Sequence, residues 1–414
     1  MKTQTRRRRV LLAAMLIDTL GGGLLTPFEL VYALKIAHLS LTSAGLVLSV
    51  AAAAGLALGP VAGAGVDRIG PARVVAVANG LGAAGCLILL LWTNVWGYAV
   101  GAFFLGTNMR VFWAAFTPLV ASIAGGAELE QWFARLRAAR YIGIVSGEGL
   151  SGLAFLAGVH TGLRLLVMAN GVSFVAALVL VLAVAPRGAA RAADEEAKPG
   201  VGGYRRVLRD RVNLLLAALN IAATLLLVTP ILVLPVFVLD RLHLPSWLPG
   251  VLAGFLTATA GAGLLFGTRF VRGRRRLRNL EIAALLWALG CAVFLLAPIG
   301  IGLGYGALFL GTLLLGLGEA LYAPTADALP AALAPVALRG RYAALHQMAW
   351  GISESIAPTL GAAMLAAGNA ALWLTLAGIA TASSLAYRVL EQPTGDRDGV
   401  AGAELTTSEL PTAR

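Results

Sequence analysis

The chain has 414 residues, of which 59% are hydrophobic and 13% are charged. Soluble domains carry about 25% charged residues, so this chain lacks the polar exterior that a soluble protein of its length needs. Its formal net charge is +12, but the basic residues fall between long apolar runs and form no continuous face, which argues against nucleic-acid binding. The composition indicates an integral membrane protein whose main partner is the lipid bilayer.

Twelve apolar segments are long enough to cross a bilayer, which takes about 20 helical residues. In the first half of the chain they are predicted at 10–33, 43–65, 73–92, 97–123, 138–158 and 163–185. In the second half they are predicted at 212–238, 248–268, 280–298, 303–329, 342–367 and 370–389. Backbone in lipid must satisfy its own hydrogen bonds, and these runs are too long for barrel strands. We therefore predict an all-α membrane protein with twelve transmembrane helices.

The first segment follows a basic N-terminus, as the apolar part of a secretory signal peptide does. It continues past Pro27 with no small-residue cleavage site, so we interpret it as an uncleaved helix. With the N-terminus in the cytoplasm, 28 of the 32 Lys and Arg residues fall on the cytoplasmic side, as the positive-inside tendency requires. We predict a multi-pass protein of the plasma (inner) membrane with both termini in the cytoplasm.

Repeated features divide the chain into two halves. Residues 116–121 recur loosely at 322–327, residues 153–158 recur at 363–368, and Cys86 is matched by Cys291. The offsets of 206, 210 and 205 residues are close to half the chain, and such internal repeats are typical of transporters. We predict two pseudo-symmetric six-helix bundles, 1–185 and 212–390, joined by a cytoplasmic linker, 186–211, and followed by a disordered tail, 391–414.

The loop after the second segment carries Gly63, Asp67, Arg68 and Gly70. It resembles the signature loop of the major facilitator superfamily, G-x-x-x-D-R/K-x-G-R/K-R/K. Positions 71 and 72 lack the two basic residues, and Arg73 follows one place later. The resemblance implies a cytoplasmic gate in which Asp67 holds the ends of the two bundles together. The alternative is a charged turn that only orients the second helix.

A glycine-rich stretch in the fifth segment is similar to the antiporter motif of the same family, G-x-x-x-G-P-x-x-G-G. Gly143, Gly147 and Gly152 match it, whereas Glu148 replaces proline and Ser151 replaces glycine. The resemblance implies export. Close helix packing through glycine is the alternative.

Five ionisable residues lie near the centres of predicted spans: Asp18, Arg110, Glu148, Glu319 and Glu354. Each costs about 2.5–3.5 kcal/mol to insert, and the resemblance implies that their helices border a central cavity. We expect Arg110 to pair with Glu148, and the other three carboxyls to lack a basic partner. A buried, unpaired carboxyl takes up a proton more readily than one in water, so these groups are candidates for proton coupling or substrate contact. Structural ion pairs and carboxyls hydrogen-bonded to their neighbours are the alternatives.

Further polar and aromatic residues are candidates for the same cavity: Glu29, Asn108, Trp113, Asn220, Tyr322, His346, Gln347 and Trp350. His346 can titrate near neutral pH, although a lone histidine in a helix is also consistent with packing alone. The aromatic residues are equally consistent with core or interface positions.

The sequence shows no phosphate-binding loop, nucleophile elbow or metal-ligand cluster, and no soluble domain of the size of an ATPase. We therefore expect no enzyme activity, cofactor or metal, and energy that comes from a gradient, from a partner, or from no source at all. The resemblance implies a monomeric drug:proton antiporter that exports small amphipathic compounds, as in multidrug resistance. A sugar, metabolite or siderophore carrier of the same fold is an alternative, and a non-transporting membrane sensor or scaffold is an alternative of another class.

Overall fold

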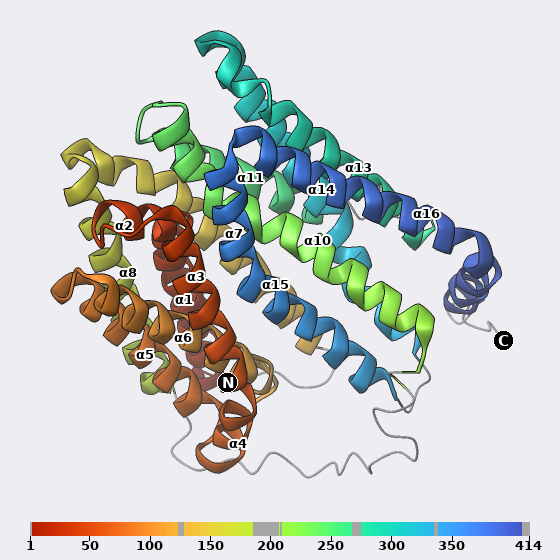
Figure 1. Cartoon of the computed structure of the whole chain (residues 1–414). Coiled ribbons are helices and arrows are strands. Elements are labelled where there is room, and N and C mark those ends of the chain that lie inside the picture. Colours follow the sequence, from red (N-terminus) through yellow and green to blue (C-terminus); the bar gives the residue numbers. More distant parts are fainter. Residues whose placement is uncertain are drawn as a thin grey trace. The chain divides into compact units, whose positions relative to one another are not determined.

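The computed structural model describes residues 2–122, 128–184, 207, 209–266, 275–334 and 338–407. The regular elements within these ranges are helices (Figure 1), which confirms the all-α prediction. Most of the predicted linker, 186–211, lies outside the described residues.

The helices of the first half are α1 (Lys2–Leu25), η1 (Thr26–Phe28), α2 (Glu29–Lys35), α3 (Leu41–Ala57), α4 (Gly59–Ile69), α5 (Pro71–Leu91), α6 (Val95–Ala121), α7 (Glu128–Ala154), η2 (Phe155–Ala157) and α8 (Val159–Val184). Those of the second half are α10 (Arg211–Val236), the π-helical turn η3 (Phe237–Arg241), α11 (Leu248–Phe266), α13 (Arg276–Phe294), η4 (Ala297–Ile299), α14 (Ile301–Leu333), α15 (Arg339–Ala367) and α16 (Asn369–Thr407). As far as the structure describes them, the twelve predicted segments each fall on one helix or on consecutive helices.

Proline marks two of the interruptions. Pro27 lies in the short turn η1 between α1 and α2. Pro60 lies at the start of α4, where the second predicted span bends by 46°. Proline has no backbone N–H and its ring crowds the preceding turn, so a helix bends or restarts at these points.

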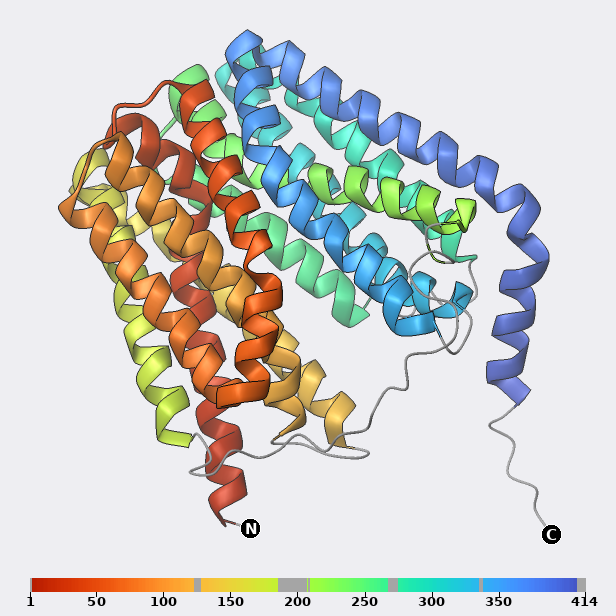
Figure 2. The ribbon, with the colours of Figure 1, turned by 60° about the horizontal axis from the view of Figure 1, so that its bottom comes forward.

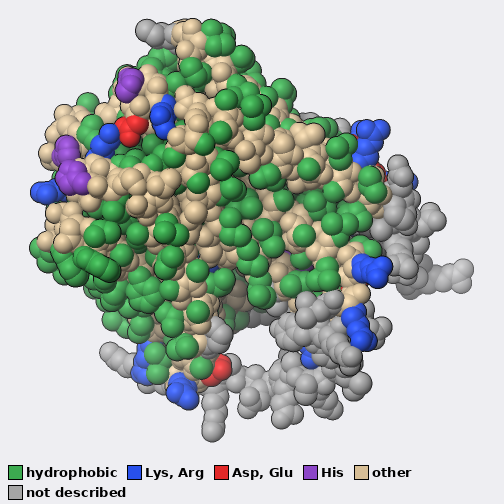
Figure 3. Space-filling model, viewed as in Figure 1, with side chains coloured by type: hydrophobic (Ala, Val, Ile, Leu, Met, Phe, Trp, Pro, Cys, Tyr) green, Lys and Arg blue, Asp and Glu red, His purple; other side chains and the backbone are tan. Residues whose placement is uncertain are grey.

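The described surface is that of a membrane protein. Eight described helices are long and apolar enough to cross a membrane, and the bent pair α3–α4 forms a ninth candidate. Large side chains such as Leu91 and Leu156 are 77% and 82% exposed, and hydrophobic side chains are spread widely over the face seen in Figure 3. Soluble monomers rarely expose so much contiguous apolar surface. The remaining long helices, α7 and α15, are not among these candidates.

The chain divides into two compact units, which are described separately. Unit 1 comprises Met1–Ala197, Val228–Ala258 and Gly351–Leu372. Unit 2 comprises Lys198–Leu227, Thr259–Trp350 and Trp373–Arg414. The boundaries of these units therefore fall within α10, α11, α15 and α16, and unit 1 contains segments of all four. The division into bundles 1–185 and 212–390 remains a prediction.

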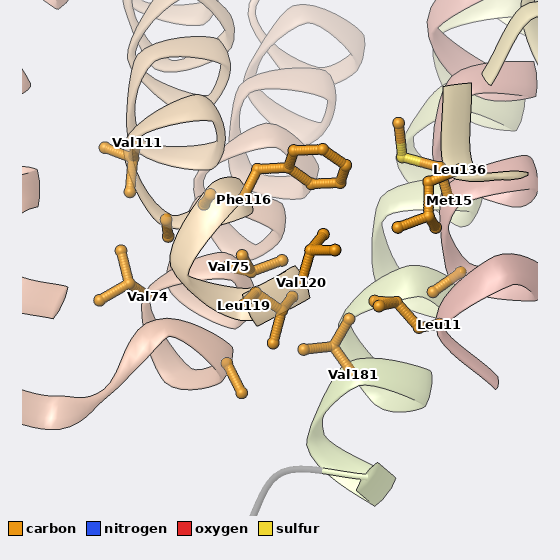
Figure 4. Packing of buried hydrophobic residues seen from close by; sticks show 14 of the residues in the cluster. Leu11, Met15, Val74, Val75, Val111, Phe116, Leu119, Val120, Leu136 and Val181 are labelled. Carbon is orange, nitrogen blue, oxygen red and sulfur yellow. The ribbon is translucent and has the colours of Figure 1, made fainter. Parts of the chain in front are cut away.

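In unit 1, α1 packs against α7 and α8, and α5 packs against α6 and α8; α1, α5, α6 and α8 lie side by side in both ribbon views (Figure 1 and Figure 2). Their facing side chains form an apolar cluster, seen in Figure 4, which includes Met15, Val75, Phe116, Leu136 and Val181. In unit 2, α13 packs against α14. This packing gives the transmembrane helices fixed neighbours within each unit.

The last helix is longer than predicted. Residues 391–414 were expected to be disordered, but α16, the long blue helix of Figure 2, extends to Thr407. Polar and glycine-rich composition alone does not end a helix, because extending an existing helix is far easier than nucleating one. Residues 408–414 lie outside the described part of the chain.

The first helices of the two halves end in the same way. His38 and His243 have φ of 55° and 52°, the left-handed conformation that closes many helices. The N–H of the following residue returns to a carbonyl six residues earlier: Leu39 to Ala33 at 3.0 Å, and Leu244 to Val238 at 3.1 Å. These paired positions are all 205 residues apart, so the repeat offset predicted from Cys86 and Cys291 is also found in backbone geometry.

Candidate functional site

An ion pair within unit 1 joins α6 to α15. Arg110 Nη2 donates to Glu354 Oε2, and the two side chains are 16% and 24% exposed. The expected partner of Arg110 was Glu148, and Glu354 was expected to have no basic partner; both expectations are wrong. The spacing of residues within spans indicates depth in the membrane, but it does not show which helices face each other.

A second arginine lies close to this pair. Arg140 of α7 interacts electrostatically with Glu354 and with Asp18 of α1, and its guanidinium carbon lies 5.0 Å from the centre of the Trp113 ring. A guanidinium over an indole face gains a cation–π attraction. Arg140 lies near the start of the fifth predicted span, 138–158, and was counted among the basic residues of the cytoplasmic side, whereas α7 begins at Glu128. The polar residues 128–140 lowered the local hydropathy and concealed the start of this helix.

The remaining acidic candidates of unit 1 are Asp18, Glu29 and Glu148. Asp18 is half-buried, and its Oδ1 is buried without a hydrogen-bond partner. Glu29, the first residue of α2, interacts electrostatically with Glu354. Glu148 of α7 is only 4% exposed. We call Asp18, Arg110, Arg140 and Glu354 the charge cluster; it brings carboxylates and guanidiniums from four helices into one region of unit 1.

The glycines of the fifth segment position α7 against α1. A Cβ on Gly143 would lie 2.1 Å from Thr19 Oγ1, and one on Gly147 would lie 2.1 Å from Leu20 O. The approach is mutual, since a Cβ on Gly23 would lie 2.5 Å from Ile144 O. The motif-like glycines therefore serve close helix packing, which brings Asp18 of α1 near Arg140 of α7.

Three candidates meet in unit 2. The Tyr322 hydroxyl donates to Asn220 Oδ1, and Asn220 Nδ2 donates to His346 O at 3.0 Å. All three residues are buried, and His346 Nε2 has no hydrogen-bond partner. The Tyr322 ring also lies 5.2 Å from the ring of Trp287. This arrangement is a polar group within an apolar unit, contributed by α10, α14 and α15.

The other candidates lie in different surroundings. Asn108 Nδ2 donates to Ala78 O at 2.8 Å and ties α6 to α5. Glu319 on α14 and Trp350 on α15 are half-buried, and Gln347 is exposed. Among the residues that the structure describes, no three His, Cys, Asp or Glu side chains are placed to hold a metal ion.

The signature loop forms the junction of α4 and α5. Asp67 and Arg68 are exposed in the last turn of α4, Gly63 lies one turn before them, and Arg73 is exposed at the start of α5. Gly70 joins the helices with φ of +85° and ψ of 154°, a conformation that L-residues with a Cβ rarely adopt. The backbone conformation at position 70 thus explains why the motif has glycine there. The gating role of Asp67 remains a prediction.

The sequence matches the family model described as Major Facilitator Superfamily over residues 11–310. Comparison with curated proteins found no match. The fold is shared with the crystal structure of the nucleoside transporter NupG, with a TM-score of 0.76 and 14% identity over 93% of this chain and 99% of that one. It is also shared with a POT family transporter in complex with a thioalcohol-conjugated peptide (TM-score 0.75, 14% identity, 94% and 96% coverage) and with the peptide transporter POT in complex with sulfate (0.73, 15%, 96% and 95%).

At this level of identity the solved structures establish the fold alone, which is that of two pseudo-symmetric halves of transmembrane helices. The family match rests on the sequence and covers more than half of the 414 residues. The chain therefore belongs to the Major Facilitator Superfamily, a family of secondary transporters.

Proposed function

We propose that this protein is a proton-coupled transporter of the plasma membrane that exports small amphipathic compounds by alternating access. The observation that carries the proposal is the Arg110–Glu354 ion pair. It joins α6 of the first half of the chain to α15 of the second half, and both residues lie within predicted transmembrane segments, 97–123 and 342–367. A charged pair at this depth is costly and is normally retained for a role in transport.

Protonation of this pair has a direct structural consequence. An ionised Glu354 accepts a charge-assisted hydrogen bond from Arg110, and such bonds are about twice as strong as neutral ones. A proton on Glu354 removes its negative charge, weakens the link between α6 and α15, and releases the guanidinium for another anion. Proton binding and helix movement are thereby coupled at one residue.

Asp18 and Arg140 extend this coupling to α1 and α7. Since Arg140 interacts with both Asp18 and Glu354, a proton gained by one carboxyl changes the field at the other through the shared cation. The glycine contacts hold α1 and α7 too close for water to enter between them at Gly143 and Gly147. We assign Asp18 and Glu354 as the proton-binding groups. Arg110 and Arg140 are the groups whose attraction to these carboxyls weakens when a proton binds.

The export direction rests on the partial antiporter motif of α7 and on the similarity to drug:proton antiporters. A carrier of polar metabolites is the second candidate. The charge cluster offers both signs of charge, which suits a zwitterion, and solved transporters of this fold include a nucleoside transporter and peptide transporters.

The proposal is tested by flux into everted membrane vesicles with an imposed pH gradient. The compounds are amphipathic cations, nucleosides and dipeptides, selected beforehand by a thermal-shift screen of the purified protein across pH. We expect uphill accumulation of at least one amphipathic compound that stops when the gradient is collapsed. Accumulation that is indifferent to the gradient would reject proton coupling, and uptake of only dipeptides or nucleosides would favour the metabolite carrier.

A further inference from the structure

A pocket of about 460 Å³ lies between the start of α13 and α16. It is lined by Arg275, which directly precedes α13, by Arg278 and Ile282 of α13, and by Glu391 of α16. All four residues belong to unit 2. The volume falls in the range of small-molecule sites, about 300–1,000 Å³, and the lining combines two cations, one carboxylate and one apolar side chain.

The two helices run antiparallel, and they meet at both ends. The rings of Phe294 and Trp373 lie 4.4 Å apart at one end, and Glu391 lines the pocket with Arg275 and Arg278 at the other. Trp373 and Glu391 are 18 residues apart, which is five turns of an α-helix and about 27 Å. They therefore lie on the same face of α16, and their separation is close to the thickness of the hydrocarbon layer, about 30 Å.

The pocket lies where both helices leave the apolar layer. The segments Arg276–Ile299 and Asn369–Glu391 are long and apolar enough to cross a membrane, so one candidate span begins and the other ends at this pocket. Beyond the pocket, Leu285 and Leu289 are 49% and 53% exposed on the helix face that carries Ile282. A polar pocket that continues into exposed leucines fits a phospholipid, which has a charged headgroup and apolar chains.

The charges of the pocket are balanced. Arg278 Nη1 donates to Glu281 Oε2 at 2.7 Å, and the Glu281 side chain is 6% exposed. A guanidinium has five N–H donors, so Arg278 keeps donors for a second acceptor while Glu281 offsets its charge. Arg275 and Glu391 then add one charge of each sign. A headgroup with a phosphate and an ammonium matches this set, whereas a headgroup with only negative charge would meet the Glu391 carboxylate.

We propose that this pocket binds the headgroup of phosphatidylethanolamine at the membrane surface, on the side that the predicted orientation makes cytoplasmic. Arg275 and Arg278 bind the phosphate, and the primary ammonium donates to Glu391. Hydrogen bonds between ionised groups are about twice as strong as neutral ones. The trimethylammonium of phosphatidylcholine has no N–H to donate, so Glu391 distinguishes the two lipids.

Arginines at the ends of membrane spans also occur without a bound lipid, because their side chains extend to the polar surface. Such arginines attract the phosphate of every phospholipid alike. A preference for ethanolamine over choline is the property that the Glu391 carboxylate adds. This preference needs neither substrate nor gradient, so the inference does not depend on the proposed transport function.

The site is tested by titrating the purified full chain in detergent with phosphatidylethanolamine, phosphatidylcholine and phosphatidylglycerol that carry identical acyl chains. Native mass spectrometry measures the fraction of protein with bound lipid and so the apparent Kd. We expect phosphatidylethanolamine to bind about five- to ten-fold more tightly than phosphatidylcholine, the difference expected for one partly exposed charge-assisted hydrogen bond. Equal binding of these two lipids, or binding of phosphatidylglycerol as tight as that of phosphatidylethanolamine, would overturn the proposal.

Three variants assign the preference to the pocket. Glu391→Gln should bring the two affinities together without weakening phosphatidylcholine, and Arg275→Gln should weaken both lipids alike and keep their ratio. Glu128→Gln is the matched control, because it makes the same chemical change at the start of α7 and should leave both affinities unchanged. A preference that survives Glu391→Gln, affinities that Arg275→Gln leaves unchanged, or a preference lost in Glu128→Gln would contradict the assignment.

Two further measurements identify the ligand as a lipid at this place. Glycerophosphoethanolamine, which has the headgroup but no acyl chains, should fail to displace the bound lipid; full displacement would show that the pocket takes a soluble phosphoester instead. Phosphatidylethanolamine with a photoreactive acyl chain should label peptides of α13 around Ile282, and unlabelled phosphatidylethanolamine should compete. Labelling confined to helices of unit 1 would place the lipid elsewhere and reject the site.

Discussion

Replacing Glu354 by Gln tests the ion pair at the centre of the charge cluster. The substitution keeps the shape of the side chain but leaves the Arg110 guanidinium without its counter-charge. Removing one partner of a fully buried pair costs about 3–5 kcal/mol, and removing one of an exposed pair costs about 0–1 kcal/mol. With 16% of the Arg110 side chain and 24% of the Glu354 side chain exposed, the free energy of unfolding should fall by an intermediate amount, about 2 kcal/mol, as for hydrogen bonds between charged groups.

A double-mutant cycle in mixed micelles measures this value. The variants are Glu354→Gln, Arg110→Gln and the double substitution, each unfolded by increasing fractions of a denaturing detergent. Residues in direct contact show coupling energies of about 0.5–3 kcal/mol, and we expect at least about 1 kcal/mol here. Glu128→Gln is the matched control, because it breaks the Arg8–Glu128 pair, in which the Glu side chain is 58% exposed, and it should cost under about 1 kcal/mol. Additive losses in the cycle would show that Arg110 and Glu354 do not interact, and the reasoning would fail.

Three further predictions address other parts of the molecule. Asp18→Asn should abolish gradient-driven flux while the protein remains folded and monodisperse, and normal coupled flux would remove Asp18 from the mechanism. Gly147→Ala should lower the free energy of unfolding by about 1–3 kcal/mol, because its Cβ would lie 2.1 Å from Leu20 O. Gly149→Ala on the same helix meets open space and should be neutral or stabilising. Similar losses of stability in both variants would contradict the packing account. Asp210 accepts hydrogen bonds from the first N–H groups of α10 and from the Tyr342 hydroxyl, so Asp210→Ala should lower stability by about 1 kcal/mol in thermal unfolding, while Asp210→Asn should retain most of it.

The helices could be predicted from the sequence because hydropathy and length alone require them. Their ends were harder to predict. The polar first turns of α7 hid its start at Glu128, and the polar sequence after Leu390 hid the continuation of α16 to Thr407. A hydropathy pattern identifies the apolar part of a helix, and it does not show how far the helix continues into polar sequence.

The candidate site could be predicted in its residue types but not in its pairs. Asp18, Arg110 and Glu354 were found because charge within an apolar span is costly. The partner of Arg110 lies 244 residues away, and only the packing of α6 beside α15 shows it. Arg140 was missed because it lies near the end of a span, where basic residues are normally signs of topology. Arg140 lies over the Trp113 ring and Arg135 lies over the Trp132 ring, so the interaction of Arg140 with Asp18 and Glu354 is what distinguishes it.

Lys35 of α2 and Asp240 of η3 form an ion pair. Their equivalence was available in the sequence, since both precede a histidine by three residues at the repeat offset of 205. The offset alone did not show that they touch. Contact between equivalent residues follows only from the twofold arrangement of the halves, and this arrangement is a property of the fold.

Proton movement driven by substrate tests the central claim most directly. The purified protein is reconstituted into vesicles that contain a pH-sensitive dye, and an identified substrate is added with no initial pH gradient. A coupled transporter must move protons whenever it moves substrate down its gradient, so we predict a change of internal pH with the native protein and none with Glu354→Gln. Substrate entry through the native protein at constant internal pH would contradict proton coupling through the charge cluster.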